Sequence, residues 1–253
     1  MPAILHFIEP DWPAPANVLA LSTTRQGGCS ASPFASLNLG HHVGDSAAAV
    51  AENRGLVASA LPVGTGIQWL SQVHGTRVVE AGRGCEYPQA DAAWSRHVKK
   101  ACAVLSADCL PVLFCSTSGD RVAAAHAGWR GLLDGVLEAT VATMGVDSDQ
   151  ILAWMGPAIG PRAFEVGPEV REQYLAAATA ADEARIEACF LPSEVRPGHY
   201  FADLYALARL RLRAVGVTGV FGGGYCTFTD AERFFSYRRD GRTGRMASLI
   251  LMR

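Results

Sequence analysis

Runs of apolar residues without regular polar alternation occupy the centre of the chain. They include Ala92–Trp94, Cys102–Leu105, Pro111–Cys115, Val122–Ala125 and, further along, Ile151–Met155. Short continuous apolar segments of this kind are typical of strands that are buried on both faces. The pattern predicts further strands at Val18–Thr24, Ile67–Leu70, Thr76–Ala81, Val220–Phe221 and Ala247–Met252.

Helical patterns lie on both sides of this strand-rich region. The predicted helices are Ala47–Leu61, Gly131–Met144, Pro168–Ala181 and Asp203–Val215. Asp45 is expected to cap the first of these helices and Gly145 to end the second. The chain contains no repeat, low-complexity tract or clear linker, so we predict one mixed α/β domain over residues 1–253.

Composition and charge exclude several classes of protein. Of the 253 residues, 49% are hydrophobic and 18% are charged, which excludes a disordered chain or a coiled coil. The formal net charge is -2 and the pI is about 6.4, and Arg238-Arg239 is the longest basic cluster. Nucleic-acid binders usually carry a basic stripe, so nucleic acid and membrane surfaces are not expected as primary partners.

The sequence also favours a cytoplasmic location. No apolar run approaches the ~18 residues of a membrane span. The segment Met1–Glu9 lacks the basic start and the long apolar stretch of a secretory signal. The 7 cysteines are odd in number and scattered, which is typical of reduced thiols rather than of a disulfide framework.

Three segments place a histidine or cysteine beside glycine or proline next to a predicted strand. They are Gln72–Gly75, Ala107–Pro111 and Ala125–Gly131. A catalytic zinc site uses three protein ligands, and His74, Cys109 and His126 would supply them. Their spacing matches no linear zinc motif, so two other interpretations stay open. Cys109 could be a buried structural cysteine beside hydrogen-bonded histidines, or a nucleophile with His74 or His126 as base and Asp108 as orienting acid.

Two arginine-bearing turns could bind an anion. Arg25 follows a predicted strand before Gly27-Gly28, and Arg130 lies where a helix is expected to begin. Backbone N–H groups at a helix start and an arginine fork together form an anion site, although a tight turn with a solvated arginine is the simpler interpretation of either segment. The segment Ser236–Gly241 has the character of a charged turn, usually a solvated hairpin, although one of its arginines could face a pocket. Gly222–Gly224 lacks the spacing of a dinucleotide fingerprint.

Several short segments, in order along nearly the whole chain, carry a resemblance to a known family. They are Thr24–Gly28, Ser36–Leu39, Val43–Asp45, Glu52–Arg54, Gln72–Gly75, Ala90–Ala92, Ala107–Pro111, His126–Gly131, Gly156–Gly160, Phe164–Gly167 and Ser236–Asp240. This set resembles the laccase-domain, YfiH-type family, whose members are described as purine nucleoside phosphorylases, polyphenol oxidases and peptidoglycan editing factors. One departure is Ser46, where family members often have a second acid after the residue that is Asp45 here.

The resemblance implies a fold and a metal site. The fold would be α/β (α+β mixed), a single-domain mixed β-sheet sandwich with flanking helices, similar to that of cysteine-dependent toxins. The metal would be zinc, held by His74, Cys109 and His126. Zinc lowers the pKa of bound water to about 7, which makes hydroxide available for attack on a purine C6.

The resemblance also implies an activity on small molecules. The leading hypothesis is phosphorolysis of adenosine, inosine and 5'-methylthioadenosine, together with adenosine deamination. Candidate substrate and phosphate ligands are Arg25, Asn38, Gln72 and Arg130, and candidate residues behind the metal ligands are Asp91 and Asp108. Alternatives are a hydrolase of nucleotide-linked cell-wall precursors that uses the metal or Cys109, a non-enzymatic binding protein, and a copper polyphenol oxidase. The copper oxidase is disfavoured because a multicopper site needs many histidines and the chain has 7.

Overall fold

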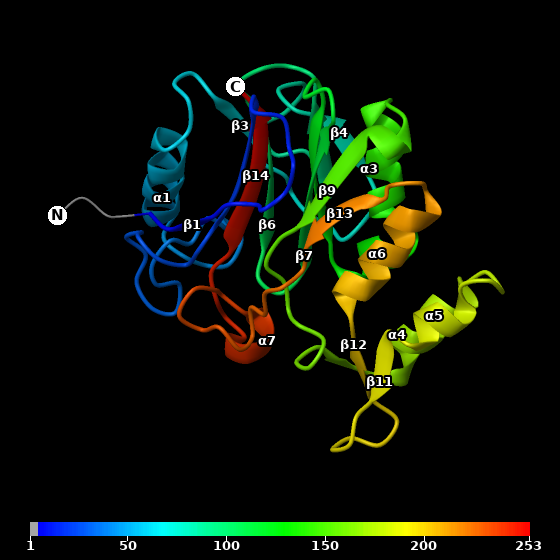
Figure 1. Ribbon diagram of the computed structural model, residues 1–253. Coiled ribbons are helices and arrows are strands. Elements are labelled where there is room, and N and C mark those ends of the chain that lie inside the picture. The colour runs from blue at the N-terminus through cyan, green and yellow to red at the C-terminus, as the bar shows by residue number, and fades with distance from the viewer. Residues whose placement is uncertain (1–4) are drawn as a thin grey trace.

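Two mixed β-sheets packed face to face form the centre of the protein in its computed structural model, which describes residues 5–253 (Figure 1). The five-stranded sheet has the order β1 (Phe7–Ile8), β2 (Val18–Thr23), β14 (Met246–Met252), β6 (Lys100–Ser106) and β3 (Gly66–Gln68). The six-stranded sheet has the order β13 (Gly219–Gly222), β9 (Ile151–Met155), β7 (Leu110–Ser116), β8 (Val122–Ala127), β5 (Ala92–Ser95) and β4 (Val78–Glu80). Each sheet contains both parallel and antiparallel pairs, so the predicted mixed α/β class is confirmed.

Helices cover the outer face of each sheet. Helix α1 (Ala47–Ser59) packs on the five-stranded sheet, and α2 (Trp129–Asp134), α3 (Val136–Met144) and α6 (Leu204–Ala214) pack on the six-stranded one (Figure 1). A smaller sheet of β10 (Glu165–Val166), β12 (Tyr200–Ala202) and β11 (Phe190–Pro192) projects from this body with α4 (Pro168–Ala176) and α5 (Glu183–Glu187). The short helix α7 (Tyr237–Asp240) lies near the lower edge of the two sheets in Figure 1.

The layered arrangement explains why the central strands do not alternate between polar and apolar residues. In β14, Ile250 and Met252 point into the core between the sheets, whereas Leu249 and Leu251 point into the core beneath α1. Every residue of β7, β8 and β14 is buried. The prediction of strands that are buried on both faces is therefore confirmed for these elements.

Several predicted helix boundaries were wrong. The expected helix Gly131–Met144 is two helices, because Gly135 adopts a left-handed conformation with φ of 101° between α2 and α3. The helix predicted at Pro168–Ala181 ends at Ala176.

The predicted cap of the first helix was also wrong. Ser46 occupies the N-cap position of α1, and no side chain caps that helix. The Asp45 carboxylate instead accepts hydrogen bonds from Ser30 and Asn38, so it ties the loop before the helix to the body of the fold.

The sequence predicted neither a membrane-spanning segment nor a secretory signal. Among residues 5–253, no helix combines the length and the apolar character that crossing a bilayer requires. The expectation that Met1–Glu9 is not a secretory signal rests partly on residues 1–4, which lie outside the described residues.

Candidate metal centre and its cavity

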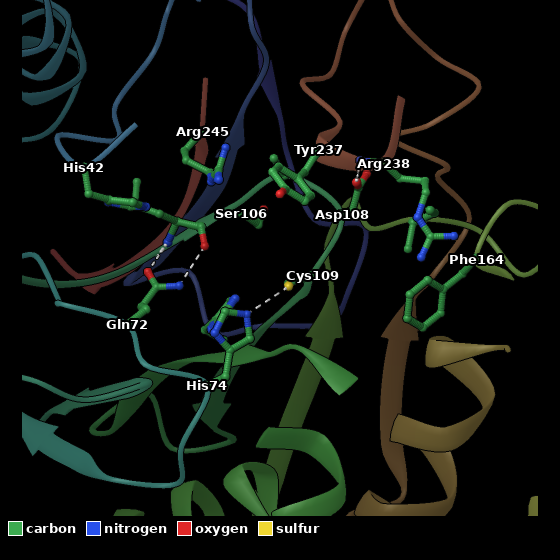
Figure 2. A pocket seen from close by; sticks show the side chains of 14 residues that line it. His42, Gln72, His74, Ser106, Asp108, Cys109, Phe164, Tyr237, Arg238 and Arg245 are labelled. Carbon is green, nitrogen blue, oxygen red and sulfur yellow. Dashed lines mark hydrogen bonds between the residues drawn. The ribbon is translucent and has the colours of Figure 1, made fainter. Parts of the chain in front are cut away.

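Three segments far apart in sequence bring His74, Cys109 and His126 together. Figure 2 shows His74 and Cys109 facing each other. His74 lies in the loop between β3 and β4, Cys109 directly precedes β7, and His126 lies in β8. Antiparallel pairing of β7 with β8 sets His126 opposite Pro111, which is two residues along the chain from Cys109. The ligand atoms of the three residues all lie within 4.8 Å of one another, and the Cys109 Sγ is 3.7 Å from the His74 Nε2.

One buried carboxylate orients two of these residues. Asp91 directly precedes β5 and is fully buried. Its Oδ1 accepts hydrogen bonds from the His126 Nδ1 and the His74 backbone N–H, both at 2.9 Å. Its Oδ2 accepts the backbone N–H groups of Val73 at 3.1 Å and Gly75 at 2.7 Å. The carboxylate therefore fixes the His74 loop and leaves the Nε2 of His126 for a metal ion, as is usual behind metal-bound histidines.

The same contacts shift the protonation equilibria of the site. Burial alone would raise the pKa of the Cys109 thiol, but the charge of His126 and hydrogen bonds from His126 and His74 lower it to about 6. Burial alone would lower the pKa of His126, but Cys109 and Asp91 raise it to about 9. In the metal-free protein at neutral pH, Cys109 is consequently a thiolate, which is the form that binds metals.

The backbone around the three side chains leaves no room for larger residues. A Cβ at Gly128 would lie 2.7 Å from the His74 Cδ2 and 3.1 Å from the Cys109 Sγ. A Cβ at Gly131 would lie 3.0 Å from the carbonyl oxygen of Gly75. These two glycines of the predicted motif therefore let the start of α2 approach the metal ligands closely.

The donor set fits a zinc ion. Tetrahedral zinc with bonds of about 2.0–2.3 Å separates its ligand atoms by roughly 3.5 Å. The 3.7 Å between the Cys109 Sγ and the His74 Nε2 is close to that separation. One thiolate and two imidazoles also suit zinc chemically. Among the described residues, this is the one group of three or more His, Cys, Asp and Glu side chains that could hold a metal.

A cavity of about 500 Å³ opens above the candidate ligands (Figure 2). Its wall carries the basic side chains of Arg238, Arg245 and His42 and the aromatic rings of Phe164 and Tyr237. The complete lining is His42, Gln72, His74, Leu105, Ser106, Ala107, Asp108, Cys109, His126, Ile159, Phe164, Tyr237, Arg238 and Arg245. The combination of a metal-binding group, aromatic surface and positive charge suits a small ligand with an aromatic part and an anionic part.

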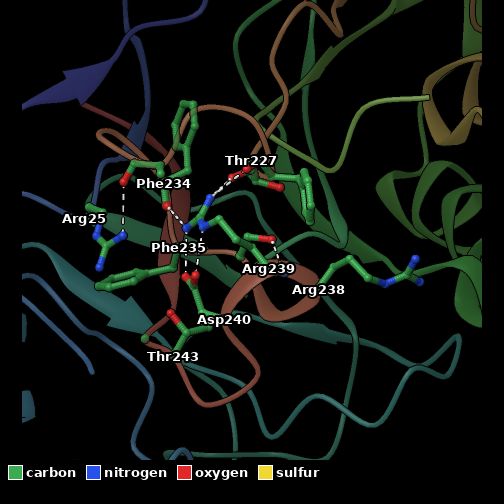
Figure 3. Close-up of polar contacts among 12 residues, drawn as sticks. Arg25, Thr227, Phe234, Phe235, Arg238, Arg239, Asp240 and Thr243 are labelled. Carbon is green, nitrogen blue, oxygen red and sulfur yellow. Dashed lines mark hydrogen bonds and ion pairs between the residues drawn. The ribbon is translucent and has the colours of Figure 1, made fainter. Parts of the chain in front are cut away.

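Helix α7 places Tyr237 and Arg238 in the cavity lining (Figure 2). Arg239 anchors the helix (Figure 3). The guanidinium of Arg239 donates to both carboxylate oxygens of Asp240 and to three backbone carbonyl groups, those of Thr227, Phe228 and Phe234. All of its N–H groups are thus used within the protein. Arg239 therefore holds the turn in place and is not free to contact a ligand.

Asp108 and Gln72 line the cavity, but both are already engaged by the protein. The Asp108 carboxylate accepts the Thr227 hydroxyl at 2.6 Å and the Arg238 backbone N–H at 2.7 Å. The Gln72 amide makes two hydrogen bonds with the backbone of Leu105 (Figure 2). Both side chains hold neighbouring segments together around the cavity.

Asn38 does not line the cavity. Asn38 is fully buried. Its side-chain amide forms hydrogen bonds with the backbone of Gly40, the Asp45 carboxylate and the backbone N–H of Arg245. The side chain that the sequence singled out as a nucleoside ligand therefore lies behind the wall that carries Arg245.

Arg25 and Arg130 also lie outside the cavity lining. Arg25 donates to the carbonyl groups of Ala35 and Ala231 and stacks on an aromatic ring. Arg130 is exposed and stacks on Trp129. The basic residues that do line the cavity, Arg238 and Arg245, were not predicted as ligands, and the only sequence signal was the charged turn at Ser236–Gly241.

Comparisons with known proteins agree on one family. A family model described as multi-copper polyphenol oxidoreductase laccase matches residues 19–253. The chain is 57% identical over 244 residues to the purine nucleoside phosphorylase PA4543 of Pseudomonas aeruginosa, covering 96% of this chain and 97% of that protein. It is 52% identical over 244 residues to the purine nucleoside phosphorylase YfiH of Escherichia coli, with coverage of 96% and 97%.

A solved structure has the same fold. The crystal structure of a protein from Neisseria meningitidis superimposes with a TM-score of 0.90 at 50% sequence identity. The match covers 97% of this chain and 98% of that one, so the similarity extends over both sheets and the surrounding helices.

Proposed function

The chain belongs to the laccase-domain, YfiH-type family, as its motifs predicted, and from this premise we propose that it is a zinc-dependent purine nucleoside phosphorylase. Its substrates would be adenosine, inosine and 5'-methylthioadenosine, and it would also deaminate adenosine. The names of two relatives that share more than half of its residues support the phosphorylase assignment.

The observation that carries the proposal is the position of the three candidate ligands. His74, Cys109 and His126 line a cavity of about 500 Å³ whose wall also carries Arg238 and Arg245. A volume of this size lies within the usual range for small-molecule sites, about 300–1,000 Å³. Phosphorolysis requires a nucleoside and an anion in one space, and this cavity offers an aromatic surface together with positive charge.

Zinc held by His74, Cys109 and His126 would supply a Lewis acid and lower the pKa of a water molecule. Asp91 would keep the His126 ring oriented and its Nδ1 protonated, since it accepts a hydrogen bond from that nitrogen. Phe164 and Tyr237 would pack against the purine ring, and the two wall arginines would favour bound anions over neutral ligands.

Zinc is proposed over copper because of the donor set. A catalytic zinc site needs three protein ligands and one open position, which this group provides. The family name refers to several copper ions, whereas the described part of the chain forms one such three-ligand group.

The proposal is tested by assaying two products of adenosine in the same sample. Ribose 1-phosphate reports phosphorolysis and inosine reports deamination, with the phosphate concentration varied. We expect both products from zinc-loaded protein and neither from Cys109→Ala. Cys115→Ala is a matched control, because Cys115 is buried between the sheets and does not line the cavity. Formation of both products at the wild-type rate by Cys109→Ala would contradict the proposal.

A further inference from the structure

A second hollow of about 400 Å³ adjoins the main cavity. The two share His42, Tyr237 and Arg245, and the second hollow adds Arg242 and Thr243. It lies between the segment Gly40–Gly44 and the turn that connects α7 to β14. A ligand in the main cavity could therefore extend past Arg245 into this space.

Two arginines face this hollow, and neither forms an ion pair within residues 5–253. Arg242 donates through Nη2 to the Gly44 carbonyl, and Arg245 donates through Nη1 to the carbonyls of Thr243 and Gly244. Over residues 5–253, these are the only hydrogen bonds that the two guanidinium groups make, so most of their N–H groups remain available to a ligand.

The neighbouring backbone is shaped around these two side chains. A Cβ at Gly40 would lie 2.8 Å from the Arg245 Cγ. A Cβ at Gly44, where φ is +88°, would lie 3.0 Å from the Arg242 Nη2. Arg245 is half-buried beside Gly40, and Arg242 is exposed at the rim of the hollow beside Gly44.

A third group at the hollow is a hydroxyl without a partner. Thr243 is 1% exposed, and among the described residues its Oγ1 accepts and donates no hydrogen bond. Buried polar groups in native proteins almost always have a partner, which is often a ligand or a water molecule when no protein group serves. The nearby carboxylate of Asp240 is engaged by Arg239 and does not neutralise the arginines.

We propose that Arg242, Arg245 and Thr243 form a phosphate-binding subsite beside the metal centre. Two guanidinium forks and a hydroxyl match the several acceptor oxygens of a phosphate group. The inference deepens the proposed function and rests on it, because phosphorolysis requires a bound phosphate. The phosphate group could belong to free orthophosphate or to a phosphate ester on the nucleoside.

The test measures binding of inorganic phosphate to zinc-loaded protein by isothermal titration calorimetry, without turnover. Arg242→Ala should weaken phosphate binding about tenfold or more, since it removes charged hydrogen bonds. Thr243→Val, which preserves the shape of the side chain, should weaken phosphate binding several-fold without destabilising the fold. Arg83→Ala is the matched control, because Arg83 is exposed and lines neither hollow.

A second arm distinguishes the two sources of phosphate. If orthophosphate occupies the subsite, it should bind equally well with saturating adenine present, a base that allows no turnover with phosphate. If an ester occupies it, adenosine 5'-monophosphate should bind more tightly than adenosine, and Arg242→Ala should abolish that difference. Either result supports the subsite.

Two outcomes separate the subsite from the phosphorylase proposal. Phosphate affinities in Arg242→Ala and Thr243→Val equal to that of Arg83→Ala would overturn the subsite, whatever the activity. Phosphate binding that both variants weaken, in a protein that forms no ribose 1-phosphate, would contradict the phosphorylase proposal and leave the subsite standing.

Discussion

Replacing Asp91 with asparagine should weaken metal binding at the candidate metal centre while leaving all three candidate metal ligands in the chain. The carboxylate accepts two hydrogen bonds on each oxygen, from the His126 ring and the His74 backbone on Oδ1 and from the backbone of Val73 and Gly75 on Oδ2. Asparagine has almost the same shape but only one accepting oxygen. Whichever way the amide is turned, two of these donors face an NH₂ group that cannot accept.

The size of the effect follows from these contacts. Each hydrogen bond to a charged group contributes about 1.5–3 kcal/mol, so loss of two should lower the free energy of unfolding by roughly 3–6 kcal/mol. The lower end is expected because the loop that carries His74 is partly exposed. Removal of a hydrogen-bond partner behind a metal-bound histidine typically weakens metal binding about 10–100-fold, and we expect Asp91→Asn to weaken zinc binding by that factor.

Zinc affinity is measured by titrating metal-free protein in the presence of a competing chelator, and stability by denaturant unfolding of the same sample. Asp120→Asn is a matched control, because the exposed Asp120 carboxylate accepts from Ser116 and Ser118 in a turn that does not line the cavity. An Asp91→Asn protein that binds zinc within about twofold of the wild-type affinity would refute the argument that this carboxylate orients the ligands.

Three further results are expected. In metal-free protein, the alkylation rate of Cys109, followed by peptide mapping, should stay high down to neutral pH and fall as the pH drops through about 6, because the lowered pKa keeps this cysteine a thiolate above that value. An alkylation rate that already falls near pH 8.5–9 would contradict the pKa argument. Gly128→Ala should cost about 1–3 kcal/mol of stability by overpacking and weaken zinc binding, whereas Gly55→Ala, where a Cβ meets nothing within 4 Å, should be neutral or stabilising. Equal unfolding free energies for the two variants would argue against the close approach of Gly128 to His74 and Cys109. Tyr205→Phe should destabilise the fold by about 1–3 kcal/mol, because it leaves the buried N–H of Ala158 without its acceptor; an unchanged unfolding midpoint would show that this N–H finds another partner.

The sequence predicted the strands better than the helix ends. Strands such as β7 and β8 are recognisable because layers on both sides require apolar residues at every position. The break at Gly135 could not be predicted from periodicity, since α2 and α3 each continue the helical pattern. Only the left-handed conformation of one glycine separates them.

The candidate metal ligands were predicted through their motifs, because linear spacing carries no information about them. His74 and Cys109 are separated by 35 residues and Cys109 and His126 by 17, and they meet only through strand pairing and the Asp91 contacts.

The cavity wall was less accessible to sequence reasoning. Arg238 and Arg245 reach the cavity because a C-terminal turn folds over the segment that precedes β7, a tertiary contact whose only sequence signal was the charged turn at Ser236–Gly241. Asn38 has a polar side chain next to a matching motif, yet its hydrogen bonds are all internal.

Stoichiometric reconstitution tests the central claim most directly. Metal-free protein is titrated with zinc while phosphate-dependent formation of ribose 1-phosphate from adenosine is followed. The account predicts that activity rises linearly and reaches its plateau at one zinc per chain, and that Cys109→Ala stays inactive throughout. Full phosphorolysis before any zinc is added, or a wild-type titration curve from Cys109→Ala, would contradict a zinc-dependent phosphorylase centred on His74, Cys109 and His126.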